Sequence, residues 1–157
     1  MRVYTHTACL AHDTGPDHAE RSARLSAVTD ALRAGLPALD WHEAPRATRG
    51  QLLRAHAPDL LDAVLETPPA QRILLDPDTV LSPASAEAAL RAAGAAVAAV
   101  DAVLTGKTRR AFCAVRPPGH HATRDAAMGF CLFNNIAVAA LHALDKHGLE
   151  RVAIVDF

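Results

Sequence analysis

The sequence has few cysteines and no long uninterrupted apolar run. Its three cysteines, Cys9, Cys113 and Cys131, lie far apart and form no Cys-x-x-Cys pair, which excludes a disulfide framework and points to a reducing compartment. The N-terminus lacks a basic segment followed by an apolar one, so we expect no signal peptide. Because no apolar run approaches the roughly 20 residues that span a bilayer, we predict a cytoplasmic protein that does not bind membranes.

An excess of charge of one sign is also absent. The net charge is −1 with histidine neutral, and the densest basic group, Lys107, Arg109 and Arg110, falls in a predicted turn. We therefore expect no direct nucleic-acid binding. With 157 residues, half of them apolar, the chain suits a single domain with a sizeable core.

Hydrophobic periodicity predicts strands that alternate with helices. We expect strands over residues 2–6, 39–44, 111–115 and 152–157, and helices over 18–34, 49–57, 59–66, 83–104 and 130–147. Residues 9–17, 67–79 and 116–128 are predicted loops. The last strand, VAIVDF, is apolar without alternation, as in a parallel strand buried on both faces. The pattern indicates an α/β fold with an open parallel sheet and helices on both faces.

The strongest chemical signal is the stretch RPPGHH at residues 116–121, which leaves the carboxyl end of the predicted strand 111–115. Ligand sites in open parallel sheets form outside the carboxyl ends of the strands. Two prolines and a glycine stiffen this loop and turn it, and two neighbouring imidazoles follow. A rigid loop that holds titratable groups suits general acid–base catalysis by His120 and His121.

Asp156 is the candidate partner of this histidine pair. It lies near the carboxyl end of the predicted strand 152–157, which we expect beside the strand 111–115. A carboxylate within hydrogen-bond reach of one histidine would fix the tautomer of its ring. A chance pair is the alternative in a chain with nine histidines, and a zinc-ligand role is disfavoured because adjacent side chains diverge.

A longer stretch, RPPGHHATRDAAMGFCLFNNIAVAA, closely resembles the histone deacetylase family, which includes deacetylase-like amidohydrolases and acetylpolyamine amidohydrolases. The segment HDTGPDHAERSARL resembles the family's N-terminal signature, although Ala19 and Ser22 stand where prolines are usual. LDPDTVLSP resembles its substrate-rim loop, and RVAIVDF the strand that carries its first metal ligands. The resemblance implies an arginase/deacetylase-like α/β fold, truncated here, with residues 1–157 as the N-terminal part of a single deacetylase domain.

The resemblance also implies zinc-dependent hydrolysis of an acetylated amine, in which zinc and water attack the acetyl carbonyl. His121 would be the main general acid–base, and His120 would be its electrostatic partner, hydrogen-bonded to Asp156. Gly129 would offer its carbonyl to the substrate N–H. Phe130 would form one wall of the channel around the lysine or polyamine stem.

Three further assignments follow from the resemblance. Asp78 matches a rim position that accepts N–H groups, Arg24 matches a position behind the site near the acetate pocket, and Asp156 also matches a potassium ligand. The residues alone leave alternatives open. Phe130 could be a core residue, Asp78 a turn residue and Arg24 a solvated helix residue.

The family's zinc ligands are expected to follow Phe157, so these residues would carry the proton-transfer half of the site without the zinc half. A catalytic zinc ion needs three protein ligands, and we therefore expect residues 1–157 alone to bind zinc poorly and to be inactive. An open edge on the strand 152–157 would also favour marginal stability, self-association or membership of a longer chain.

The sequence thus favours the N-terminal half of a zinc-dependent deacetylase that acts on acetylated lysine or acetylated polyamine amides. The alternative is a non-catalytic deacetylase-like module that binds acetylated ligands or a partner subunit. The choice among these substrates and the oligomeric state stay open. The high alanine and arginine content is typical of bacterial proteins.

Overall fold

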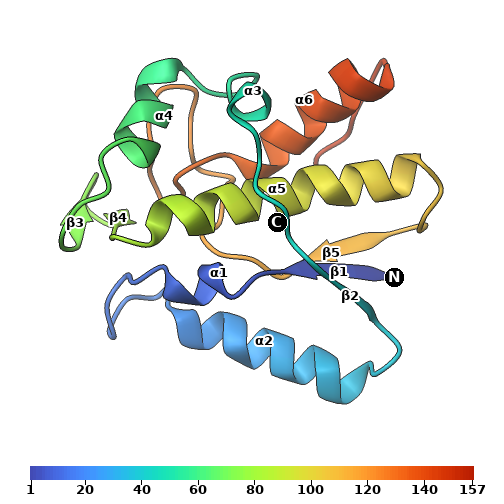
Figure 1. The fold of residues 1–157 in the computed structure, drawn as a ribbon, viewed down its shortest axis with the longest axis horizontal. Helices are drawn as coiled ribbons and strands as arrows, with labels where there is room; N and C mark the ends of the chain where they lie inside the picture. Colours follow the sequence, from blue (N-terminus) through green and yellow to red (C-terminus); the bar gives the residue numbers. More distant parts are fainter.

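The computed structural model describes all 157 residues and contains two sheets and six helices (Figure 1). The strands are β1 (Arg2–Thr5), β2 (Asp40–Glu43), β3 (Ile73–Leu74), β4 (Val80–Leu81) and β5 (Ala111–Cys113). The helices are α1 (Ala8–Ala11), α2 (Ser22–Gly35), α3 (Arg49–Leu52), α4 (Pro58–Leu65), α5 (Ser85–Leu104) and α6 (Asn135–His147). None of these helices has both the length and the hydropathy needed to cross a membrane.

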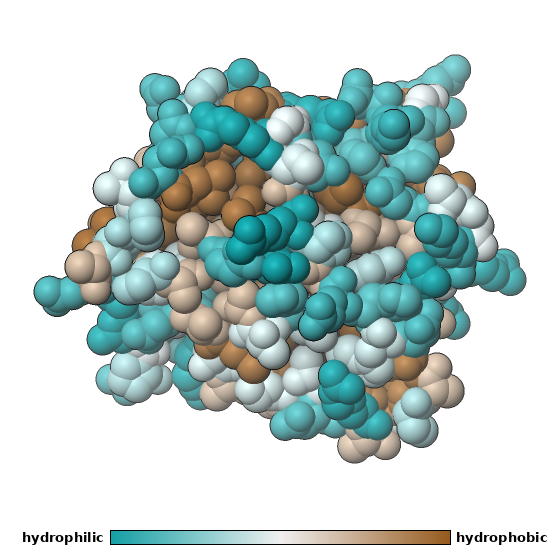
Figure 2. All heavy atoms as spheres, viewed as in Figure 1, coloured by the Kyte–Doolittle hydropathy of each residue, from teal (hydrophilic) through white to brown (hydrophobic).

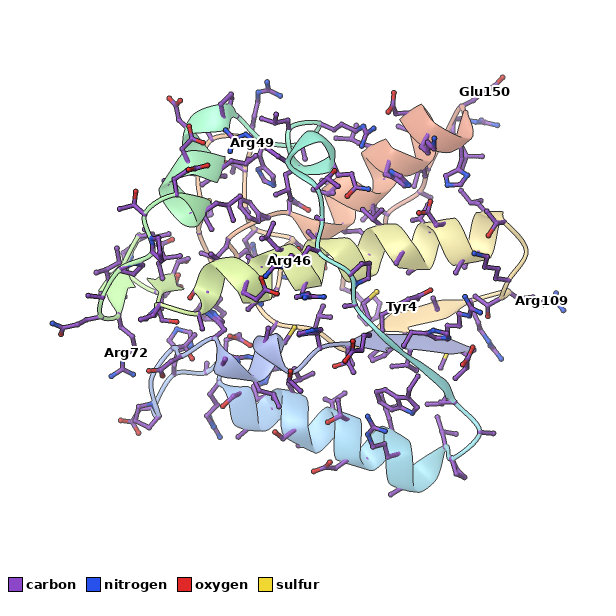
Figure 3. The ribbon with its side chains drawn as sticks, in the orientation of Figure 1. Tyr4, Arg46, Arg49, Arg72, Arg109 and Glu150 are labelled. Carbon is purple, nitrogen blue, oxygen red and sulfur yellow. The ribbon has the colours of Figure 1, made fainter.

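The larger sheet is parallel and has the strand order β2-β1-β5. Helix α2 lies on one side of it and α5 on the other (Figure 1). Successive side chains of a strand point to opposite faces. Val3 therefore packs with Leu25 of α2, whereas Tyr4 packs with Ala95 and Ala102 of α5 (Figure 3). The predicted open parallel sheet with helices on both faces is confirmed.

The main core lies on the other side of α5, where α3, α4 and α6 pack. Its 13 buried residues are Ala47, Leu52, Leu60, Leu61, Val64, Leu81, Ala89, Ala93, Val97, Ala127, Leu132, Phe133 and Val138. Helix α5 is thus covered on both sides, and its small alanines let backbone approach closely. The N–H of Ala47 donates to the carbonyl of Leu90 over 2.9 Å. Figure 2 shows a mostly hydrophilic outer face, with a hydrophobic area between α3 and α4.

Two helices begin four or five residues later than the sequence pattern predicts. Helix α2 begins at Ser22 rather than residue 18, and α6 begins at Asn135 rather than residue 130. The side chain of Asn134 accepts a hydrogen bond from the N–H of Ala137, which fixes the start of α6. Helix α1 and strand β3 lie largely in segments that were predicted to be loops, and β4 directly follows one of these segments. All three elements are too short to show a period.

The prediction of a buried strand over residues 152–157 is wrong. This segment forms no strand, and its apolar side chains are exposed, with Val155 82% accessible. A strand of this composition is stable only where both faces are covered. Phe112 on the edge strand β5 is itself 42% exposed, so the edge of the sheet offers no such cover.

A buried polar network joins the N-terminal segment to α5 and to the loop after β5. Nδ1 of His12 lies 2.7 Å from Oγ of Ser85, and Nε2 of His12 lies buried 3.9 Å from a carboxylate oxygen of Glu20. Glu20 in turn pairs with the buried guanidinium of Arg116. Burial of the imidazole, reinforced by the positive charge of Arg116, lowers the pKa of His12 to about 4.

This depressed pKa predicts an acid-sensitive fold. Between pH 6.5 and about 4 the unfolded chain protonates His12 and the folded chain does not, so the free energy of unfolding falls as the pH falls. The full effect of this one group is on the order of 3 kcal/mol. Urea unfolding at several pH values should show a shallower pH dependence for His12→Asn than for the wild type.

An unchanged slope in His12→Asn would contradict the assignment.

Candidate active site

The two histidines lie on the loop that leaves the carboxyl end of β5. Both side chains are exposed, and their ring centroids are 4.3 Å apart at an angle of 62°. Nδ1 of His120 lies 3.0 Å from Oδ1 of Asp156. An ionised carboxylate can only accept, so this contact places a proton on Nδ1 of His120. The structure therefore brings His120, His121 and Asp156 together.

The start of α6 holds this loop in place. A Cβ atom at Gly119 would lie 2.5 Å from the backbone nitrogen of Asn135, so only glycine permits this close approach. The side-chain amide of Asn135 donates to the carbonyl of Pro117 over 3.2 Å, and that of Asn134 donates to the carbonyl of Ala122 over 2.9 Å. The loop is thus fixed on both sides of the histidine pair.

A third, buried histidine fixes the far end of the loop. His56 accepts a hydrogen bond at Nε2 from the N–H of Asn134 and donates from Nδ1 to the carbonyl of Thr123, both over 2.8 Å. Burial lowers the pKa of His56, although its backbone partners oppose the shift. Its ring therefore acts as a neutral bridge, a role for which the sequence gives no local signal.

Gly129 and Phe130 form a tight bend against the histidine pair. Both residues have positive φ, 57° and 69°, a conformation that costs a non-glycine residue about 1–2 kcal/mol. Contacts from the rim loop compensate: Oδ2 of Asp76 accepts from the N–H of Gly129, and Oγ1 of Thr79 accepts from the N–H of Phe130. A Cβ atom at Gly129 would lie 2.7 Å from Cβ of His121, so bend and histidine are in direct contact.

Asp76 organises this rim, although the sequence pattern alone did not single it out. Its Oδ1 accepts hydrogen bonds from the N–H groups of Asp78, over 2.9 Å, and Thr79, over 2.6 Å. Burial opposes ionisation of the carboxyl, but these bonds and the one from Gly129 hold the pKa of Asp76 below its usual range. The Asp-Pro-Asp-Thr sequence is a recognisable turn signal that could have identified it.

Phe130 and Asp78 are connected through His18. The rings of His18 and Phe130 meet edge to face with centroids 4.8 Å apart, and Nε2 of His18 lies 3.0 Å from the carbonyl oxygen of Asp78. The Asp78 carboxylate is exposed, and its one protein partner is the hydroxyl of Thr79 at 3.4 Å. The carboxylate of Asp78 is therefore still able to accept further N–H groups.

Arg24 lies apart from the other candidates. It is exposed on α2 and makes no hydrogen bond or ion pair through its side chain. Together with Phe112, Arg116 and Pro118 it lines a cavity of about 200 Å³ behind the histidine loop. The structure thus places Arg24 behind the loop without contact to either histidine.

The contact between Gly129 and His121 predicts a specific cost for Gly129→Ala. The substitution should lower the free energy of unfolding by about 1–2 kcal/mol through its positive φ and by at least a further ~1 kcal/mol through the overlap with His121. Urea unfolding gives the loss, and the imidazole NMR signals of His121 should shift.

Gly106→Ala is the matched control, because Gly106 also has positive φ, 75°, but a Cβ atom added there would meet no other atom within 4 Å. Gly106→Ala should lower the free energy of unfolding only by the backbone cost of the positive φ. Equal losses in the two variants would mean that the bend does not press on His121.

Comparison with known proteins identifies the family of this chain. Residues 18–157 match the family model described as the histone deacetylase domain. The chain is 42% identical to a histone deacetylase-like amidohydrolase of Pseudomonas aeruginosa over 96% of its own length. It is also 42% identical to the human polyamine deacetylase HDAC10 over 88% of its length.

A solved structure gives the same result for the fold. The HD domain of HDA15 superposes with a TM-score of 0.86 and 34% identity over 92% of this chain. The chain spans 38% of the Pseudomonas relative, 22% of the human one and 43% of the HDA15 chain, so it corresponds to part of each. The family match over residues 18–157 shows that the chain belongs to the histone deacetylase domain family.

Proposed function

We propose that residues 1–157 supply the proton-transfer groups and one channel wall of a deacetylase that hydrolyses acetylated lysine or acetylated polyamine amides. The observation that carries this proposal is the arrangement of His120, oriented by Asp156, beside His121 on the Gly129–Phe130 bend. Neighbouring imidazoles with one ring fixed by a carboxylate suit the movement of a proton between water and an amine.

In this proposal His121 accepts a proton from the attacking water as the new C–O bond forms at the acetyl carbon. It then gives that proton to the amine nitrogen as the C–N bond breaks, which releases acetate and a free amine. His120 stays oriented by Asp156 and stabilises the charge that develops on its neighbour. These exposed groups face the rim rather than the core, as access to a substrate requires.

The substrate contacts are proposed on the same bend. The carbonyl of Gly129 would accept from the amide N–H of the substrate, and the ring of Phe130 would pack along an extended methylene stem. His18 supports that ring at its edge, and the exposed Asp78 carboxylate would bind N–H groups of the substrate at the rim. The relatives named above act on polyamines or belong to the amidohydrolases, which favours acetylated amines as the substrate class.

Zinc is the cofactor that the family implies, and it would polarise the acetyl carbonyl and activate water. The residues of this chain do not fit it at the histidine loop. The one group of three clustered metal-binding side chains contains neither His120, His121 nor Asp156. A catalytic zinc site requires three protein ligands, so we propose that a complete domain supplies them from outside residues 1–157. Potassium near Asp156 is likewise part of the proposal for the complete domain.

The proposal predicts the effect of removing the proton carrier from the natural gene product that contains these residues. The wild-type protein should release acetate from an acetylated polyamine or an acetyl-lysine peptide. His121→Ala should lower kcat by about 10²–10⁴-fold, the range typical of a general acid–base, with little change in KM. Steady-state kinetics with both substrates gives the comparison.

His42→Ala serves as the control, because His42 pairs with Asp40 on β2. It should leave kcat unchanged. Full activity of His121→Ala would overturn the assigned role. Tight binding of the acetylated amine by the wild type without release of acetate would instead favour the binding-module alternative.

A further inference from the structure

A second cluster of polar side chains lies at the C-terminal ends of α5 and α6. Nε2 of His142 lies 2.8 Å and Nε2 of His147 lies 2.7 Å from the same oxygen of Asp101, Oδ1. The side-chain atoms of Asp101, His142 and His147 that could bind a metal ion all lie within 4.8 Å of one another. The cluster is remote from the proposed active site, because α5 runs back along the sheet and ends where β1 and β5 begin (Figure 1).

The cluster has a buried side, formed by His142, and a solvent-accessible side, formed by His147 and Asp101. The side chain of His142 is 6% exposed, and its one hydrogen bond is the contact of Nε2 with Asp101, so this contact alone orients the polar edge of the ring. His147 is 19% exposed and Asp101 is 48% exposed. The three side chains therefore form a shallow site with a rigid inner ligand and access for solvent.

The two helix ends also favour a cation at this place. Asp101 lies in the last turn of α5 and His147 is the last residue of α6, and both helices end on the same side of the molecule (Figure 1). The C-terminus of a helix carries a partial negative charge from its unpaired carbonyl groups. Two such ends therefore add to the negative charge of the Asp101 carboxylate.

We propose that Asp101, His142 and His147 bind a divalent transition-metal ion of the zinc type. Two imidazole nitrogens and one carboxylate oxygen suit zinc, whereas magnesium and calcium prefer oxygen ligands alone. Tetrahedral zinc with bonds near 2.1 Å separates its ligands by about 3.4 Å, so the present 2.7–2.8 Å contacts need to widen by less than about 1 Å. Water can complete the coordination from the exposed side of Asp101.

The bound ion would act as a structural clamp. It would join the last turn of α5 to the end of α6, after which the chain turns at Gly148 toward residues 149–157. This role is independent of the proposed deacetylase activity, because none of the three residues contacts the histidine loop. Without a metal ion, the same side chains form a hydrogen-bonded cluster only.

Titration of the metal-free 157-residue chain with Zn²⁺ against a chromophoric chelator tests the proposal. We expect one zinc ion per chain and a higher melting temperature, with no comparable effect of Mg²⁺. His147→Ala should weaken zinc binding at least about tenfold and abolish the shift in melting temperature. Because His147 lies at a helix end, circular dichroism should show that this variant stays folded.

His120→Ala and His42→Ala are the matched controls, since each removes a histidine that pairs with an aspartate elsewhere in the chain. Both should bind zinc as the wild type does. X-ray absorption should show two imidazoles and oxygen ligands, without sulfur from the free cysteines. The proposal is wrong if zinc does not bind, if His120→Ala rather than His147→Ala abolishes binding, or if sulfur ligands appear.

Discussion

The buried ion pair between Arg116 and Glu20 is the interaction on which the proposed active site depends. Both side chains are almost fully buried, at 4% and 3% exposure. The guanidinium also donates to the carbonyl of Cys9 over 2.8 Å and to that of His12 over 3.0 Å. A buried charge that loses its partner costs several kcal/mol. The N-terminal segment and the loop after β5 are therefore strongly constrained to stay together.

This constraint reaches the chemistry through a short series of contacts. Arg116 is the residue from which the proline–glycine loop runs to His120, and Glu20 lies two residues after His18. His18 supports the ring of Phe130, while Asp76 and Thr79 hold the backbone of the bend on which His121 rests. The site is thus built from segments distant in sequence, and the buried ion pair links the two segments that carry the supporting and the reacting histidines.

Features with a local cause were predictable from the sequence. Pro58 marks the start of α4, an alanine-rich periodic pattern marks α5, and Thr48 caps the start of α3. Features that depend on distant partners were not predictable. Glu20 and Arg116 are 96 residues apart, and nothing local marks either as buried. The apolar segment 152–157 was predicted as a strand from its composition. Whether it forms a strand depends on neighbouring elements that must pack against both of its faces. The composition and position of the loop after β5 identified the histidine pair, and the family resemblance identified the bend, but their catalytic roles stay predictions.

The most direct measurement is the free energy of unfolding of Glu20→Gln by urea, compared with Asp62→Asn. Asp62 forms an exposed ion pair with Arg49, with both side chains about half accessible. The buried pair predicts a loss of about 3–5 kcal/mol for Glu20→Gln, because the Arg116 charge is left uncompensated. Because the Asp62–Arg49 pair is exposed, the free energy of unfolding of Asp62→Asn should fall by less than about 1 kcal/mol. Similar small losses in both variants would contradict the claim that this ion pair holds the N-terminal segment and the histidine loop together.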